Sequence, residues 1–221
     1  MPYNEGNLFS KDGIKLNLED KNLSLSGEIK YNHLTPIKYD IMGPFKFLPM
    51  ECKHEIVSVN HMLEGGIRLN GEYLDFTGGT GYIEGDEGKS FPESYTWIQC
   101  NDFYKKYSIV VSIATIPLGP LNFKGCICNI NYLGNEYRMA TYLGVKVKEC
   151  SEQKIILTQR KYKLIIDISK SNGKNLSAPD NGKMIRTIKE DISCKANFKF
   201  FINNDLLFDI ADENTSFEYV E

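Results

Sequence analysis

The stretch IRLNGEYLDF, residues 67–76, places the dipeptide Asn70-Gly71 between two short runs of alternating apolar and polar residues. Asn-Gly readily adopts the left-handed backbone that a two-residue hairpin turn requires, so this stretch predicts a β-hairpin. Similar turn-forming clusters occur in SKSNGKN (169–175) and SAPDNGK (177–183). The pattern indicates antiparallel strands joined by tight turns.

Alternation with a period of two residues continues along the rest of the chain. In YSIVVSI, residues 107–113, the side chains of Tyr107, Ile109, Val111 and Ile113 share one face. Similar alternation occurs within residues 23–31, 137–148 and 198–202. Apolar side chains on one face and polar ones on the other are typical of half-buried antiparallel strands.

Helical periodicity is scarce. The best candidate is about one turn after Phe91, where Pro92 suits the first helical position. The sequence therefore predicts an all-β fold with very little helix, either an antiparallel barrel or two packed barrel-like sheets. Barrels of this kind often enclose a cavity for one apolar ligand. We expect a single domain over residues 1–221, with a soft division near 117–120, where IPLGPLN interrupts the strands.

Composition excludes several classes of function. The net charge of −3 argues against a nucleic-acid surface, which needs an excess of basic residues. No run of about 18 apolar residues is present, so we expect no membrane span. The first residues lack the pattern of a signal peptide, which predicts a cytoplasmic protein with reduced cysteines. Cys126 and Cys128 would share one strand face, but no second cysteine pair completes a metal site, so buried thiols and no metal are expected.

Common catalytic signatures are missing. There is no dinucleotide-binding or phosphate-binding glycine motif, and GGTGYIEG at 78–85 fits turns better than a phosphate loop. Histidines occur at positions 33, 54 and 61. A single histidine on a strand is more often structural than catalytic, so both interpretations stay open for His54 and His61.

The segment GYIEGDEGKSFPESYTWIQC, residues 81–100, and the residue after it resemble the signature of the tocopherol cyclase family. The matching positions are Glu84, Asp86, Gly88, Phe91, Pro92, Tyr95, Trp97, Gln99 and Asn101. The preceding segment, residues 41–61, is similar to the segment before the signature in bacterial members, with matches at Met50, Glu51, Cys52, His54, Ser58 and His61. YRMATYLG (137–144) and SAPDNGKM (177–184) resemble later segments of the family.

Two departures from the family pattern stand out. Glu87 occupies the position of the family's tryptophan before glycine, which replaces an aromatic side chain by a charge. Family members also usually run longer at the N-terminus. If that segment supplies strands, we expect an open sheet edge, which would favour pairing with a second copy of the chain.

The resemblance implies a fold related to lipocalin-like proteins, a group that includes carotenoid hydratases, and it implies a reaction. A prenylated quinol is cyclised to a chromanol: a proton adds to the side-chain alkene, and the phenolic oxygen closes on the tertiary cation. This intramolecular isomerisation requires no redox cofactor or metal. It requires a protonated acid in a dry site, an aromatic wall for the cation, and a group that orients the phenol.

The resemblance assigns candidate proton-transfer residues. Glu84 is the first candidate for the acid, and Asp86 lies two residues on, on the same strand face. If both faced a dry cavity, their like charges would keep one of them protonated. His61 or His54 could take the phenol proton. The structural alternative is that Glu84 and Asp86 only cap the turn into Phe91-Pro92 and stay solvated. In that case Asp86 and Glu87, beside Lys89, form a solvated loop tip.

Candidate ligand-binding residues follow on the same segment. Tyr82, Tyr95 and Trp97 could form the aromatic wall. Trp97, Gln99 and Asn101 share one strand face, which places two amides beside an indole. Alternatively, the aromatic residues belong to the core, and the amides satisfy backbone groups at a rim.

Three functions remain open at this stage. The first is a cyclase acting on a prenylated quinol or related apolar substrate. The second is a lipocalin-like carrier that binds an apolar small molecule without chemistry. The third is an interaction module that pairs through an open sheet edge. A buried Glu84 facing an aromatic cavity would favour the enzyme.

Overall fold

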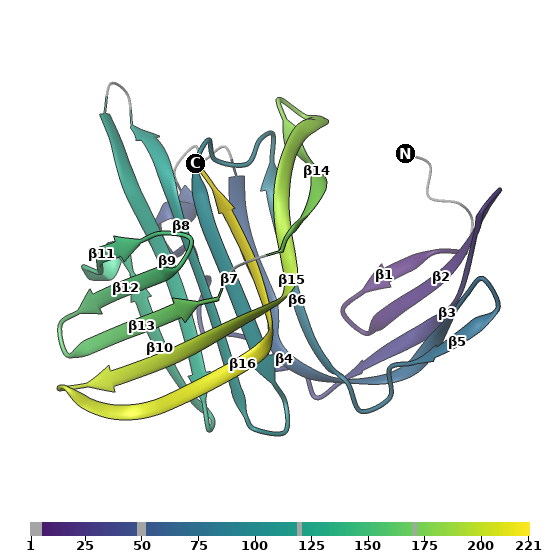
Figure 1. Ribbon diagram of the computed structural model, residues 1–221, viewed down its shortest axis with the longest axis horizontal. Helices are drawn as coiled ribbons and strands as arrows, with labels where there is room; N and C mark the ends of the chain where they lie inside the picture. The colour runs from purple at the N-terminus through teal and green to yellow at the C-terminus, as the bar shows by residue number, and fades with distance from the viewer. Residues whose placement is uncertain (1–5, 48–51, 119–120, 170–171) are drawn as a thin grey trace.

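The computed structural model describes residues 6–47, 52–118, 121–169 and 172–221 (Figure 1). Within these ranges the chain forms two antiparallel β-sheets, and neither sheet closes into a barrel. The prediction of an all-β fold with very little helix is confirmed. No helix in the described ranges has the length and apolar character needed to cross a lipid bilayer.

The first sheet has the order β1-β2-β3-β4-β5, and β6 also pairs with β4. Its strands are β1 (Leu8–Ser10), β2 (Gly13–Asp20), β3 (Leu23–Asn32), β4 (Cys52–Leu69), β5 (Glu72–Asp75) and β6 (Thr80–Gly88). The predicted hairpin is confirmed: Leu69 pairs with Glu72, and Asn70 and Gly71 have positive φ angles of 50° and 90°. In Figure 1, β1, β2, β3 and β5 extend away from the second sheet.

Strand β4 connects the two parts of this sheet. Its second half, from Met62 to Leu69, pairs with β3, and its first half pairs with β6. The β4–β6 register shifts between Ile56 and Ser58 and again between Ser58 and His61. Such irregularities bend a strand and re-aim its side chains. The first half of β4, with β6, can therefore pack against the second sheet while β3 and β5 extend away from it.

The second sheet has the order β10-β9-β8-β7-β16-β15-β13-β12-β11, and β14 also pairs with β15. Its strands are β7 (Tyr95–Asp102), β8 (Tyr107–Leu118), β9 (Leu121–Tyr132), β10 (Asn135–Ala140), β11 (Lys146–Cys150), β12 (Lys154–Gln159), β13 (Tyr162–Ile168), β14 (Lys174–Asp180), β15 (Lys183–Ile202) and β16 (Asp205–Val220). Strands β8 and β9 pair on both sides of the predicted soft division. Residues 119–120 of that division lie outside the described residues.

Strands β7 to β9 of the second sheet bury side chains on both faces. One face, with Ile98, Ile109 and Cys128, belongs to the main core together with side chains of β12, β13 and β15. The opposite face carries Val110, which packs with Ile41, Met42, Ile56 and Val59 in a smaller core. The candidate site lies beside this smaller core, between the two sheets.

The predicted helical turn after Phe91 is wrong. Residues 91–94 are irregular, because Arg186 of β15 hydrogen-bonds the carbonyl oxygens of Phe91, Pro92 and Glu93. The described 3-10 turns are η1 (Gly43–Phe47) and η2 (Thr141–Leu143). The expectation for the cysteine pair is confirmed: Cys126 and Cys128 are both buried in the main core as free thiols. Burial raises the pKa of Cys126 to about 12.

Candidate active site

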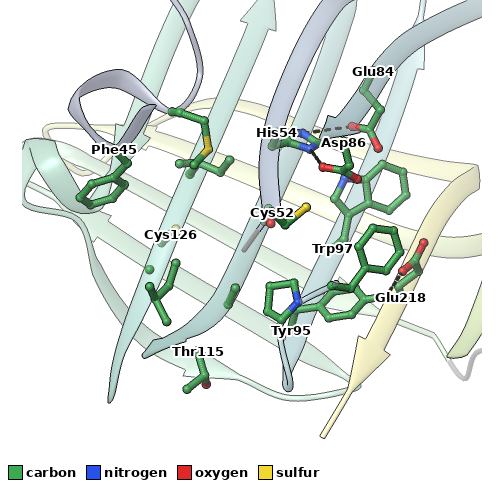
Figure 2. Close-up of a pocket in the computed structure, with 18 residues that line it drawn as sticks. Phe45, Cys52, His54, Glu84, Asp86, Tyr95, Trp97, Thr115, Cys126 and Glu218 are labelled. Carbon is green, nitrogen blue, oxygen red and sulfur yellow. Dashed lines mark hydrogen bonds and ion pairs between the residues drawn. The ribbon is translucent and has the colours of Figure 1, made fainter. Parts of the chain in front are cut away.

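A cavity of about 160 Å³ lies between the two sheets (Figure 2). Strands β4 and β6 of the first sheet form one wall, and β7, β8, β9 and β16 of the second sheet form the other. Its aromatic lining comes from Phe45, Phe91, Tyr95 and Trp97. The described lining also contains three carboxyl groups and a histidine, with no lysine or arginine. The cavity therefore combines aromatic surface with acid–base groups.

On the first-sheet wall, His54 lies between two carboxylates. Its Nδ1 atom is 3.0 Å from Asp86 Oδ1, and its Nε2 atom is 3.1 Å from Glu84 Oε2. The arrangement follows from strand geometry. Glu84 and Asp86 are two residues apart and share a face of β6, and His54 of β4 is the direct cross-strand partner of Asp86. Asp86 is thus part of a strand and not of a loop, although it is exposed to solvent.

The surroundings of His54 favour its protonated form. Burial lowers its pKa, but the interactions with Asp86 and Glu84 outweigh burial and raise the pKa to about 9. His54 is therefore an imidazolium at neutral pH, and its side chain is only 11% exposed. The cluster of one imidazolium and two carboxylates has a net negative charge when both acids are ionised.

Tyr82 extends this cluster on β6. Its hydroxyl donates a hydrogen bond of 2.6 Å to Glu84 Oε2, and its ring packs against the smaller core. Burial, and then the charge of Glu84, raise the pKa of Tyr82 far above its ordinary value, so the phenol stays protonated. Glu84 faces two donors, Tyr82 and His54, and acts in this structure as a hydrogen-bond acceptor. Tyr82 supports Glu84 and does not line the cavity.

The second-sheet wall carries Glu218, which the sequence interpretation did not single out. Glu218 of β16 accepts a hydrogen bond of 2.5 Å from the hydroxyl of Tyr95 on β7, and both residues line the cavity. Burial and the charges of Glu190, Glu84 and Asp86 raise the pKa of Glu218 to about 6, although the Tyr95 hydrogen bond opposes this shift. Glu218 is the direct cross-strand partner of Trp97. Figure 2 shows Tyr95 and Glu218 on a different side of the cavity from His54.

Trp97 lines the cavity. Its indole lies between the His54 cluster and the Tyr95–Glu218 pair (Figure 2). The Nε1 atom is buried and has no hydrogen-bond partner among the described residues. Because Trp97 is the only tryptophan of the chain, its fluorescence would report on the cavity directly.

Gln99 and Asn101 lie outside the cavity lining, although they share the strand face of Trp97. Gln99 donates to Asn101 Oδ1 at 2.9 Å, and Asn101 donates to the carbonyl oxygen of Gly81 at 2.8 Å and to Asn60 Oδ1 at 3.2 Å. These bonds join β7 to β6 and β4. The placement agrees with the structural alternative, in which the amides satisfy backbone groups.

His61 is also placed away from the cavity. It is 1% exposed, its ring centroid lies 4.7 Å from that of Tyr31, and its Nδ1 atom lies 3.2 Å from Ser58 Oγ. Burial lowers its pKa to about 4, so the ring is neutral at neutral pH. Among the upstream matches, Cys52 joins His54 at the cavity, whereas Met50 and Glu51 lie outside the described residues.

The fold and this cavity define an all-β protein with an acid–base pocket between two sheets. Residues 24–214 match the sequence pattern of the family described as tocopherol cyclase-like, and the chain belongs to this family. The resemblance of the 81–101 segment is thus confirmed at the level of the family.

The fold is also similar to that of kievitone hydratase from Nectria haematococca, with a TM-score of 0.54 and 11% sequence identity. The alignment covers 98% of this chain and 69% of that one. At this identity the likeness concerns the fold alone. No curated protein sequence matches the chain.

Proposed function

We propose that the chain is an enzyme that protonates the alkene of a neutral, apolar substrate and lets an oxygen nucleophile close on the resulting cation. Cyclisation of a prenylated phenol or quinol is the reaction of this type that the family relationship favours. The observation that carries the proposal is the placement of His54 between Glu84 and Asp86 on the wall of an aromatic-lined cavity.

The proposed reaction moves one proton and no electrons overall. The alkene takes a proton, and its π electrons form the new C–H bond, which leaves a tertiary carbocation. The phenolic oxygen then bonds to that carbon and loses its own proton to a carboxylate. Substrate and product are isomers, so the protein has to supply one proton donor, one proton acceptor and stabilisation of the cation.

The charge of the cavity suits a cationic intermediate. Glu84, Asp86 and Glu218 line it, and His54 is the one basic group among its described lining residues. A cation near these carboxylates and over the face of Trp97 is favoured in a site with little water. The same charges disfavour phosphate or carboxylate groups on the substrate, so we infer a neutral substrate rather than a prenyl diphosphate.

The size of the cavity limits what it can enclose. A dry apolar cavity of about 150 Å³ holds one benzene molecule, and the cavity here measures about 160 Å³. It therefore suits one aromatic ring or the reacting end of a prenyl chain, with the rest of a larger substrate outside.

Incubation with a panel of prenylated phenols and quinols in D₂O, followed by mass spectrometry, tests the proposal. Cyclisation gives an isomer with one carbon-bound deuterium, and capture of the cation by water would give a hydrate. His54→Gln and Glu84→Gln should lower turnover by about 10²-fold or more. Glu213→Gln is the matched control, because Glu213 is an exposed carboxylate paired with Lys195 on β15.

The carrier alternative predicts a different result from the same panel. A carrier would quench Trp97 fluorescence on binding an apolar ligand and would release that ligand unchanged. Binding without any product across the panel, or turnover that survives both cavity variants, would contradict the proposed enzyme.

A further inference from the structure

We infer that Glu218, held by Tyr95, is the proton donor of this cavity, and that the His54 cluster on the opposite wall accepts the proton released by the oxygen nucleophile. This inference rests on the proposed function and divides its two proton transfers between the two sheets. It gives Glu84 the role of acceptor, whereas the sequence interpretation made it the acid.

The position of Glu218 in the cavity suits a proton donor. Glu218 pairs with Trp97 across β16 and β7, so their side chains leave the same face of the sheet. Tyr95 lies two residues before Trp97 on that face, and its hydroxyl reaches the Glu218 carboxyl at 2.5 Å. All three side chains line the cavity. A substrate alkene lying on the indole would have the Glu218 carboxyl beside it.

The carboxyl groups on the two walls of the cavity differ in their hydrogen-bond partners. On the first-sheet wall, Glu84 faces the donors Tyr82 and His54, and Asp86 faces His54. Oxygen atoms of both carboxyl groups thus face donors, which places them as acceptors on this wall. Among the described contacts, the Glu218 carboxyl has only the Tyr95 hydroxyl as a hydrogen-bond partner. Other carboxylates surround it, and this favours its neutral form.

Three carboxyl groups act on Glu218. Glu190 of β15 is its direct cross-strand partner, and Glu84 and Asp86 lie across the cavity on β6. These acids and burial raise the pKa of Glu218 to about 6. Arg186 of β15 acts on the neighbouring Tyr95, and its guanidinium is engaged by the carbonyl oxygens of residues 91–93. Among the described residues, the groups that shift the pKa of Glu218 include no basic side chain.

The proposed step is balanced. The O–H bond of Glu218 breaks as the alkene carbon forms its new C–H bond, and the electrons of the O–H bond stay on the carboxylate. The oxygen nucleophile bonds to the cationic carbon and gives its proton to Glu84 or Asp86. Exchange with water returns a proton to Glu218 and removes one from the first-sheet wall.

The test compares two tyrosine–carboxylate pairs. Glu218→Gln removes the donor, and Asp212→Asn alters a similar pair in the main core, where Tyr107 donates to Asp212 Oδ2 at 2.6 Å. We expect Glu218→Gln to lower kcat by about 10²–10⁴-fold with a KM within a few-fold of wild type. Asp212→Asn should leave kcat nearly unchanged once folding is verified. Glu218→Asp should keep partial activity, which separates loss of the acid from loss of the fold.

The pH profile gives a second readout that a structural role would not move. Because the donor works in its protonated form, kcat/KM should fall as the pH rises through about 6. Tyr95→Phe removes the hydrogen bond that lowers the pKa of Glu218, so it should move this limb to higher pH. Glu190→Gln removes a neighbouring negative charge and should move it to lower pH. Tyr107→Phe should not move it.

The failures of the two proposals are distinguishable. Turnover that depends on His54 but survives Glu218→Gln overturns the inference and leaves the proposed function standing. Absence of turnover with every substrate overturns the proposed function. In that case, infrared difference spectra still test the donor: a protonated carboxyl band titrating near pH 6 should vanish in Glu218→Gln, and a band that stays in the variant contradicts the assignment.

Discussion

His54 Nδ1 lies 3.0 Å from Asp86 Oδ1 because the two residues are directly paired on β4 and β6. The pairing turns an acidic stretch of sequence into a charge cluster around a largely buried histidine, whose side chain is 11% exposed. It also fixes the ring, since the other nitrogen of His54 faces Glu84 at 3.1 Å. A histidine held in this way contributes to folding as well as to the chemistry of the cavity, and its contribution depends on pH.

The stability of the protein should fall between about pH 6.5 and 9. The pKa of His54 rises from 6.5 to about 9 on folding, so its contribution is fully present below pH 6.5 and is lost as the pH passes 9. At roughly 1.4 kcal/mol per pKa unit, this contribution is at most about 3.5 kcal/mol. Urea unfolding of wild type and His54→Gln at pH 6.5 and 9 measures it. Equal wild-type stability at both pH values would contradict the charge state of His54.

Gly81→Ala should destabilise the protein by about 1–3 kcal/mol through overpacking. A Cβ atom at Gly81 would lie 2.1 Å from Nε2 of the buried His61 ring. Gly85→Ala, on the same strand, is the matched control because its Cβ would meet no atom within 4 Å. Thermal unfolding of both variants, and of Gly81→Ala combined with His61→Ala, would show whether the clash is the cause. Equal costs for the two glycine variants would exclude it.

The sequence predicts the strands and several shared faces well, because period-two alternation and Asn-Gly turns are local signals. The common face of Glu84 and Asp86, and that of Trp97 and Gln99, follow from the same rule. Alternation does not tell which strands pair. The partnership of Trp97 with Glu218 joins residues far apart in the chain, so Glu218 could not be selected as a cavity residue.

The placement of His54 and His61 could be predicted only in part from the sequence. They lie seven residues apart, so alternation along one strand predicts opposite faces, yet both stayed open as proton acceptors. In the structure His54 reaches the cavity and His61 is buried against Tyr31, and the β4–β6 pairing between them is irregular. Bulges of this kind depend on tertiary packing, and the local pattern of residues does not reveal them.

A hydrophobic ligand with a positive charge should bind more tightly than its neutral isostere. The cavity contains more carboxyl groups than basic groups, and Trp97 offers its face to a cation. We expect a protonated prenyl-type tertiary amine to bind about tenfold more tightly than the matching alkane, and a matching carboxylate to bind most weakly. Titration of Trp97 fluorescence ranks the three ligands. Preference for the anion would contradict the charge assigned to the cavity.

Asn101→Ala should lower the free energy of unfolding by about 1–3 kcal/mol and leave ligand binding nearly unchanged. The variant leaves the Gly81 carbonyl oxygen and the Asn60 side chain without their Asn101 hydrogen bonds, away from the cavity. Asn197→Ala is the control, since Asn197 donates to Asp209 at an exposed position. A large loss of ligand affinity in Asn101→Ala, with stability preserved, would restore Asn101 as a binding residue.

Arg138→Met should weaken ligand binding although Arg138 does not line the cavity. Its guanidinium donates to the carbonyl oxygens of Tyr39 and Asp40 at 2.6 Å and 2.8 Å, and pairs with Glu136 at 3.2 Å. These bonds attach the segment that carries the lining residues Met42 and Phe45 to β10, the edge strand beside β9.

Without them we expect Phe45 to lose its fixed position and ligand affinity to fall by about tenfold, which corresponds to roughly 1.4 kcal/mol. Tyr142→Phe is the milder comparison, because it removes a single bond of 3.0 Å to the carbonyl oxygen of Ile41. Fluorescence titration gives the affinity, and urea unfolding gives the stability of each variant. Wild-type affinity in folded Arg138→Met would show that the wall holds its position without this attachment.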